Sequence, residues 1–103
     1  MSSLALSYVV NLLARREYSE FELRNKMQEK AFTEDEIDET IAYCQKKNWQ
    51  NDKRFAENYL HARSQRGYGA NRIKQELRQL KGVSSDVINE VLAESEINWI
   101  EIA

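Results

Sequence analysis

His61 and Cys44 are the chain's single histidine and single cysteine, the side chains best suited to nucleophilic or metal chemistry. His61 lies about 240° around its predicted helix from Phe55, off the apolar face. No Cys/His spacing typical of a metal site accompanies it, so we interpret His61 as an exposed structural residue. Cys44 follows Ile37 and Ile41 at helical spacing, which predicts a buried apolar side chain rather than an activated nucleophile.

Phosphate-binding and carboxylate chemistry find equally little support. Gly67-Tyr68-Gly69 has neither the length of a phosphate-binding loop nor a Lys-Ser/Thr pair after it. The acidic residues between positions 34 and 39 occupy the start of a predicted helix, where the helix macrodipole favours negative charge. We therefore predict that the chain is not an enzyme and has no catalytic residue, no metal ion and no cofactor.

Cations gathered in the second half of the chain are the more informative pattern. Residues 53–82 carry eight basic and two acidic side chains, a net charge of +6, in a chain whose total is −2. Lys74, Arg78 and Lys81 recur at i, i+4, i+7, one position displaced from an apolar stripe. We predict a binding surface for an acidic or polyanionic partner, made of Arg63, Arg66, Tyr68, Arg72, Lys74, Arg78 and Lys81. The alternative is a solvated helix face, helped by pairs such as Arg72 with Glu76.

An internal repeat organises these residues. Shifting the sequence by 50 positions aligns Tyr18 with Tyr68, and likewise Leu23 with Ile73, Met27 with Leu77, and Asn48-Trp49 with Asn98-Trp99. A slip of one residue then aligns Phe32-Thr33 with Val83-Ser84. We predict one repeat over residues 1–50, a basic repeat over 51–98, and a third repeat that begins at residue 99 and stops at 103. Because Trp49, Trp99, Tyr18 and Tyr68 recur, we interpret them as packing residues.

Three helices are expected in the first repeat. The first spans about residues 3–16 and turns Leu6, Val9, Val10 and Leu13 inward. Ser19 with Glu22, and Thr33 with Glu36, have the spacing of capping boxes, so helices begin there. Leu23 and Met27 lie on one face of the second helix, and Ile37, Ile41 and Cys44 on one face of the third, which ends near Asn48.

The second repeat follows the same plan. Asp52 is expected to cap a helix that buries Phe55, Tyr59 and Ala62, and Gly67-Tyr68-Gly69 ends it. The next helix is expected to bury Ile73, Leu77 and Leu80 and to stop at Gly82. A sixth helix is capped by Ser84 or Ser85, and its inward residues are Val87 or Ile88, Val91 and Leu92. With no proline and three glycines, the composition also favours helix. The predicted fold class is all-α, with tandem three-helix-bundle repeats.

Composition bounds the setting of the protein. The chain is 42% hydrophobic and 31% charged, and no apolar run approaches the roughly 18 residues of a membrane span. A single cysteine agrees with a reducing compartment, and the N-terminal residues lack a positively charged leader. We expect a monomeric cytoplasmic protein without a membrane partner.

One ordered set of motifs resembles a known family. The stretch from Lys47 to Ala56 contains Asp52-x-Arg54-Phe55-Ala56; the Arg66-Gly67-Tyr68-Gly69 turn and Ile73-Lys74-Gln75-Glu76-Leu77 follow. This order is similar to that of the RecX family, and residues 15–24 resemble the first repeat of that family. The resemblance covers nearly the whole chain from Leu6 to Trp99.

The resemblance implies a function that composition and periodicity do not show. RecX proteins consist of three tandem three-helix repeats and restrain the RecA recombinase. They lodge in the groove of the RecA filament on DNA, hinder its growth, and lower its ATPase and strand-exchange activities during DNA repair and recombination. The alternative is a DNA-binding module resembling a helix-turn-helix, with direct contact to single- or double-stranded DNA. Against that alternative, Asn and Gln residues that could read bases are not clustered with the arginines.

Overall fold

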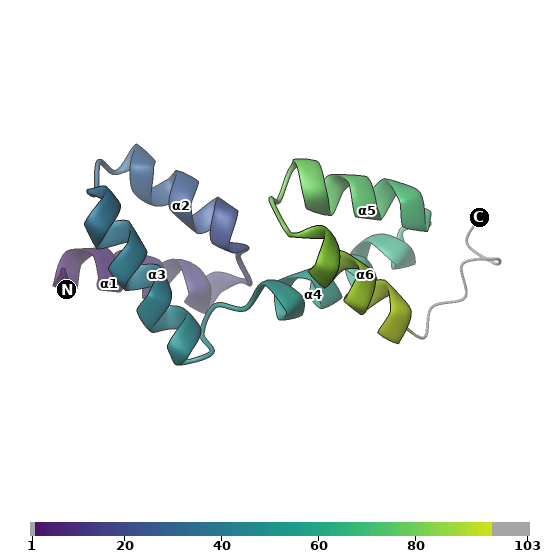
Figure 1. The fold of residues 1–103 in the computed structure, drawn as a ribbon, viewed down its shortest axis with the longest axis horizontal. Coiled ribbons are helices and arrows are strands. Elements are labelled where there is room, and N and C mark those ends of the chain that lie inside the picture. The colour runs from purple at the N-terminus through teal and green to yellow at the C-terminus, as the bar shows by residue number, and fades with distance from the viewer. Residues whose placement is uncertain (1, 96–103) are drawn as a thin grey trace. The chain divides into compact units, whose positions relative to one another are not determined.

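The computed structural model describes residues 2–95, which contain six α-helices and no strand. The helices are α1 (Ser3–Arg15), α2 (Glu20–Glu29), α3 (Glu34–Lys46), α4 (Asp52–Gln65), α5 (Ala70–Gln79) and α6 (Ser85–Glu94). They form two compact units that divide between Asn51 and Asp52: α1–α3 make unit 1 and α4–α6 make unit 2 (Figure 1). Within each unit every helix contacts the other two. The predicted all-α fold of three-helix repeats is confirmed.

Helix starts in unit 1 are fixed by side-chain caps. The Ser19 hydroxyl accepts a hydrogen bond from the Glu22 N–H at 3.2 Å, and the Glu22 carboxylate accepts one from the Ser19 N–H at 3.1 Å. Thr33 and Glu36 repeat this reciprocal pair at the start of α3, with distances of 3.2 and 2.9 Å. Both predicted capping boxes are confirmed, and they satisfy backbone donors that the first turn of a helix leaves unpaired.

The core of unit 1 contains most of the predicted residues. Its fully buried side chains include Leu23, Met27, Ile37, Ile41 and Cys44, as expected from the apolar spacing. Helix α1 is the exception, because it buries Ala5, Val9 and Leu12, while Val10 remains 38% exposed and Leu6 and Leu13 are only partly buried. Apolar residues occur on two adjacent faces of α1, and the contacts with α2 and α3 select the face that is buried.

The core of unit 2 departs from the predicted faces at two helices. Asp52 was predicted to cap α4, but it is the first residue of that helix. The helix buries Phe55, Ala56 and Leu60. Of the other residues predicted to be buried, Ala62 is exposed and Tyr59 is half-buried. Helix α4 packs against both α5 and α6, so its buried face is broad and shifted from the apolar stripe that we predicted. In α5, Ile73 and Leu77 are buried, whereas Leu80, the C-cap residue, is 62% exposed. In α6, Ile88 and Val91 are buried, and Val87 and Leu92 pack partly against them.

Left-handed backbone positions mark the ends of helices. Gly67 follows α4 with φ +86°, and Gly82 follows α5 with φ +64°. In unit 1 the corresponding conformation is adopted by Ala31, with φ +63°, and by Asn48, with φ +60°. Glycine adopts positive φ without steric cost, whereas an alanine there is strained.

The repeated aromatic residues do not share one environment. Tyr18 is buried and Tyr68 is half-buried, whereas Trp49 is 44% exposed. Trp99 and the predicted start of a third repeat at 99–103 lie outside the described residues. In the part of the chain that the structure describes, no helix is both long enough and apolar enough to cross a bilayer.

Candidate functional site: a cation cluster on unit 2

Two guanidinium groups lie close to the ring of Tyr68. The turn after α4 is made possible by Gly67, and it places Tyr68 between the last turn of α4 and the first turn of α5. The guanidinium carbon of Arg72 lies 3.8 Å from the centre of the Tyr68 ring, and that of Arg63 lies 5.5 Å from it. Both distances are within the range of a cation–π interaction. The fold therefore brings together three of the predicted site residues around one aromatic ring.

Glu76 is the counter-ion of this cluster. Its carboxylate accepts a hydrogen bond from the Tyr59 hydroxyl at 2.6 Å and one from Arg72 Nε at 3.3 Å, and Arg63 Nε lies 4.0 Å away. The Tyr59 hydroxyl, with help from Arg72 and Arg63, lowers the pKa of Glu76. Burial and the Glu76 carboxylate raise the pKa of Tyr59. Glu76 thus stays ionised and offsets part of the positive charge beside Tyr68.

The remaining predicted site residues occupy other positions around α5. Arg78 donates a hydrogen bond to the Ser85 hydroxyl on α6. Lys81 lies beyond the end of α5, and its ammonium group is 5.9 Å from the centre of the Tyr59 ring. Arg66 and Lys74 are exposed, and neither side chain forms an ion pair with another of residues 2–95. Lys74 and Arg78 thus lie on α5 and Lys81 lies after it, and the binding surface that includes all three stays a prediction.

A stripe of amide side chains on α5 is the feature that the sequence interpretation missed. Asn71, Gln75 and Gln79 are all exposed and follow one another at intervals of four residues. At 3.6 residues per turn these positions share the outer face of α5, between Arg72 on one edge and Arg78 on the other. The statement that amides are not clustered with the arginines is therefore wrong. The sequence contained the four-residue spacing of these amides, but their common face follows only when the segment is treated as a helix.

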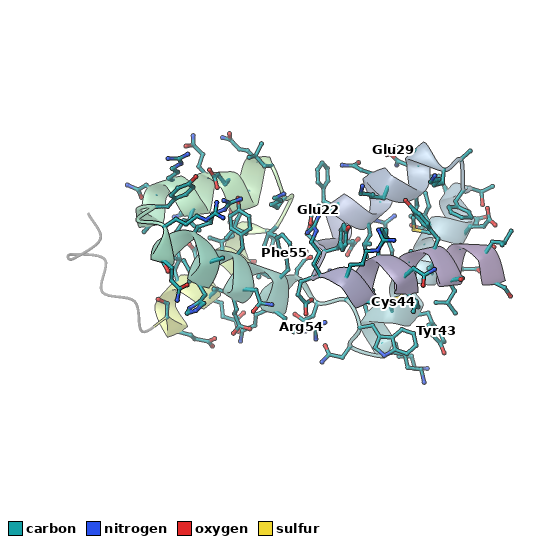
Figure 2. The ribbon with its side chains drawn as sticks, turned by 180° about the vertical axis from the view of Figure 1, so that it is seen from behind. Glu22, Glu29, Tyr43, Cys44, Arg54 and Phe55 are labelled. Atoms are coloured by element: carbon teal, nitrogen blue, oxygen red, sulfur yellow. The ribbon has the colours of Figure 1, made fainter. Side chains whose placement is uncertain are left out.

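The start of α5 has no side-chain cap and no acidic residue in its first turn. Gly69 occupies the cap position and makes no side-chain hydrogen bond. Backbone N–H groups at the start of a helix attract anions, and Arg72 adds a positive charge to the same turn. Figure 2 marks Glu22, which stands in unit 1 at the position that Arg72 holds in unit 2. The arrangement in unit 2 is suited to binding phosphate or carboxylate groups.

Side chains with catalytic or metal-binding potential lie elsewhere or are unsuited to that chemistry. His61 is exposed on α4, 3.0 Å from the Gln65 amide, as an exposed structural histidine should be. Cys44 is fully buried, and burial raises the pKa of its thiol, which disfavours the reactive thiolate. Among residues 2–95, no group of three or more His, Cys, Asp or Glu side chains could hold a metal ion.

Two three-helix units, the second with a cluster of cations, define a helical repeat protein. The family model described as RecX, first three-helix domain, matches residues 5–44, and that of the second three-helix domain matches residues 51–92. The chain belongs to the RecX family of regulatory proteins. The resemblance predicted from the motif order is thus confirmed.

The chain is similar in sequence to several proteins named regulatory protein RecX. That of Haemophilus influenzae (strain PittEE) is 73% identical over 103 residues, which are all of this chain and 68% of the relative. That of Mannheimia succiniciproducens is 68% identical over 103 residues, or 67% of its length. That of Pasteurella multocida is 76% identical over 90 residues, which are 87% of this chain and 55% of the relative. The chain therefore spans about two thirds of the first two relatives.

Proposed function

We propose that the chain binds the RecA filament through unit 2 and lowers its ATPase, growth and strand-exchange activities during DNA repair and recombination. The observation that carries the proposal is membership of the RecX family together with the cation cluster around Tyr68. An acidic strip of the filament, or its DNA backbone, is the complementary surface. We further propose that the chain acts in the cytoplasm as a monomer and as a regulator, without catalysing a reaction.

The exposed cations supply most of the proposed affinity. Arg72 already pairs with Glu76, so transferring it to a partner exchanges one ion pair for another. Arg66 and Lys74 form no ion pair with residues 2–95, so a contact with a partner carboxylate or phosphate is a net gain for them. Arg78 gives up only a neutral hydroxyl. Charged contacts at the rim of an interface mainly raise the association rate, and they weaken as salt rises.

The test is the ATPase activity of RecA on single-stranded DNA, measured as this chain is titrated in. We expect saturable inhibition by the native chain. The triple variant Arg66→Ala, Lys74→Ala, Arg78→Ala should need about tenfold more protein for half-inhibition, since each exposed ion pair contributes up to about 1 kcal/mol. The matched control Arg15→Ala, Lys26→Ala, Lys30→Ala removes the same charge from unit 1 and should inhibit like the native chain.

Two results would contradict the proposal. Absence of both inhibition and filament binding by the native chain would remove the RecA assignment for these 103 residues. Equal losses in the two triple variants would show that net charge, rather than the cluster on unit 2, is what the filament recognises. Far-UV circular dichroism of each variant distinguishes lost contact from lost helix.

The amide stripe of α5 supports a second candidate function, direct binding of duplex DNA. Asn and Gln side chains pair with the base edges exposed in the major groove, and Arg72 and Arg78 would reach phosphates on either side. DNA binding without RecA should then weaken steeply with salt. Lys74→Ala should lower the salt dependence by about one phosphate contact, whereas Gln75→Ala should reduce sequence preference and leave the salt dependence unchanged. If Lys74→Ala left the salt dependence unchanged and Gln75→Ala left the sequence preference unchanged, this face would be excluded as the DNA contact.

A further inference from the structure

A pair of aromatic side chains on unit 1, the half-buried Tyr43 and the exposed Trp49, is separate in sequence from the cation cluster of unit 2. Tyr43 is on the last part of α3, and Trp49 follows the end of that helix. Their ring centres are 5.8 Å apart, with an angle of 67° between the ring planes. Trp49 is 44% exposed, and Figure 2 shows Tyr43 at the margin of its unit. An edge-to-face pair of this kind leaves part of the indole surface open to a partner.

The backbone around Trp49 is pinned on both sides. Asn48 adopts the left-handed conformation, and the N–H groups of Trp49 and Gln50 both donate to the carbonyl of Cys44, at 2.8 and 3.3 Å. Gln50 is 1% exposed, and its amide donates to the Tyr18 carbonyl at 3.2 Å. These hydrogen bonds fix the backbone position from which the indole projects. Trp49 is thus carried by a hydrogen-bonded turn and remains 44% exposed there.

Cationic side chains border the aromatic pair. Lys46 and Lys47 are both exposed, and the Lys47 ammonium group lies 5.6 Å from the centre of the Tyr43 ring. The acidic first turn of α3 is at the opposite end of a 13-residue helix, about 15–20 Å away. Glu39, one turn before Tyr43, limits the positive region on that side. The pair with its two lysines, Tyr43, Lys46, Lys47 and Trp49, is called the aromatic patch below.

We propose that the aromatic patch binds single-stranded nucleic acid. One unpaired base stacks on the indole of Trp49, and Lys46 and Lys47 contact the phosphates next to it. Aromatic stacking combined with a cationic border is the usual way in which proteins hold single strands without regard to sequence. Duplex DNA does not fit the patch, because its bases are already stacked on one another. The proposal is independent of RecA binding and of the face of α5.

The experiment uses the fluorescence of Trp49 in the full chain. The variant Trp99→Phe leaves Trp49 as the single tryptophan, since the chain has two. Titration with an oligothymidine of about 15 nucleotides should quench this fluorescence to saturation. In the same background, Trp49→Ala should weaken binding of a labelled oligothymidine by about tenfold, read by anisotropy, and Trp49→Phe should restore part of it.

Charge variants test the phosphate contacts separately. Lys46→Ala with Lys47→Ala should lower the slope of log affinity against log salt by about 1.4, since each phosphate contact to a single strand contributes about 0.7. Lys26→Ala with Lys30→Ala is the matched control from α2 and its cap, and it should leave both slope and quenching unchanged. The unit 2 triple variant should also leave the quenching of Trp49 unchanged, which separates this patch from the cation cluster.

Three outcomes would overturn the proposal. The first is the absence of quenching by oligothymidine at low salt. The second is binding that Trp49→Ala leaves unaltered while circular dichroism shows the helices intact. The third is stronger quenching by RecA alone than by the oligonucleotide, which would assign the aromatic patch to a protein contact.

Discussion

Units 1 and 2 have the same three-helix plan but opposite chemistry at the start of their second helices. In unit 1, Ser19 caps α2 and the first turn carries Glu20 and Glu22. In unit 2 the corresponding positions are Gly69, which makes no side-chain cap, and Ala70 and Arg72. One unit caps its helix terminus with its own side chains, and the other has no side-chain cap and carries a cation in its first turn. The difference shows that solvent-facing positions can change their chemistry while the fold is preserved.

Buried positions behave in the opposite way. Leu23 and Ile73 are both fully buried at equivalent places, and Met27 and Leu77 are 0% and 1% exposed. Shape and apolar character are retained there because each core is densely packed and tolerates little change in volume. The contrast between the units is therefore a contrast between their surfaces.

Truncating the equivalent core residues should have the largest effect. Met27→Ala in unit 1 and Leu77→Ala in unit 2 should each destabilise their own unit by about 2–5 kcal/mol, through lost apolar contact and the cavity left behind. Amide hydrogen exchange is the measurement: Leu77→Ala should accelerate exchange chiefly in α4–α6, and Met27→Ala chiefly in α1–α3. Equal acceleration in all six helices would show that the two cores unfold as one.

Exchanging the helix caps tests the difference between α2 and α5 directly. Ser19→Ala should cost about 1 kcal/mol, because the Glu22 N–H loses its acceptor. Gly69→Ser should gain a few tenths of a kcal/mol, since Gly69 has φ −74° and a Cβ there meets nothing within 4 Å. Urea denaturation measures both changes. A Gly69→Ser variant that is more stable yet inhibits RecA less would indicate that the open terminus serves binding.

Exchanging glycine and alanine at the two left-handed turns should change the unfolding free energy by a smaller amount and in opposite directions. Ala31 and Gly82 occupy equivalent turns with φ +63° and +64°. Gly82→Ala should cost about 0.5–1 kcal/mol, the left-handed strain less the entropy that alanine removes from the unfolded chain, and Ala31→Gly should gain a similar amount. Thermal denaturation of both variants checks the pair. Changes of the same sign in both would mean that contacts of the added or removed methyl group outweigh backbone strain.

The smallest expected effect is a change in acid stability. The pKa of Glu76 in the folded chain is lowered from 4.5, so its contribution to stability is complete above about pH 4.5 and is lost as the pH falls through the lowered value. Glu76→Gln should therefore flatten the fall in unfolding free energy between about pH 5 and pH 3. In unit 1, hydrogen bonds from Thr33 lower the pKa of Glu36, and Glu36→Gln is the matched comparison. Urea denaturation at several pH values is the measurement, and a curve for Glu76→Gln parallel to that of the native chain would contradict the prediction.

Local patterns predicted the elements of this fold well. Ser19 with Glu22 and Thr33 with Glu36 have their capping partners three residues away, so the sequence alone identified both helix starts. Ile37, Ile41 and Cys44 share one narrow apolar face, and all three are buried. The errors arose where two faces of a helix were plausible, as at Val10, or where a helix ended earlier than its apolar spacing, as at Leu80.

The candidate site was predicted less completely than the fold. Residue types placed the cations in the second repeat, and the spacing of Lys74 and Arg78 gave their neighbouring positions on α5. The role of Glu76 was only partly foreseen, because its pairing with Arg72 follows from helical spacing whereas its hydrogen bond with Tyr59 joins residues 17 positions apart on different helices. No pattern within one helix contains such a contact.

The sequence by itself determined the six helices, the repeat, the charge of each repeat and the family, since all of these can be read from residue types and their order along the chain. Tertiary structure alone decided which face of α1 and α4 is buried, that Arg63 and Arg72 both approach the Tyr68 ring, and that Trp49 is 44% exposed. The physical reason is that burial and ion pairing depend on how neighbouring helices pack, and packing joins residues that are distant in the chain.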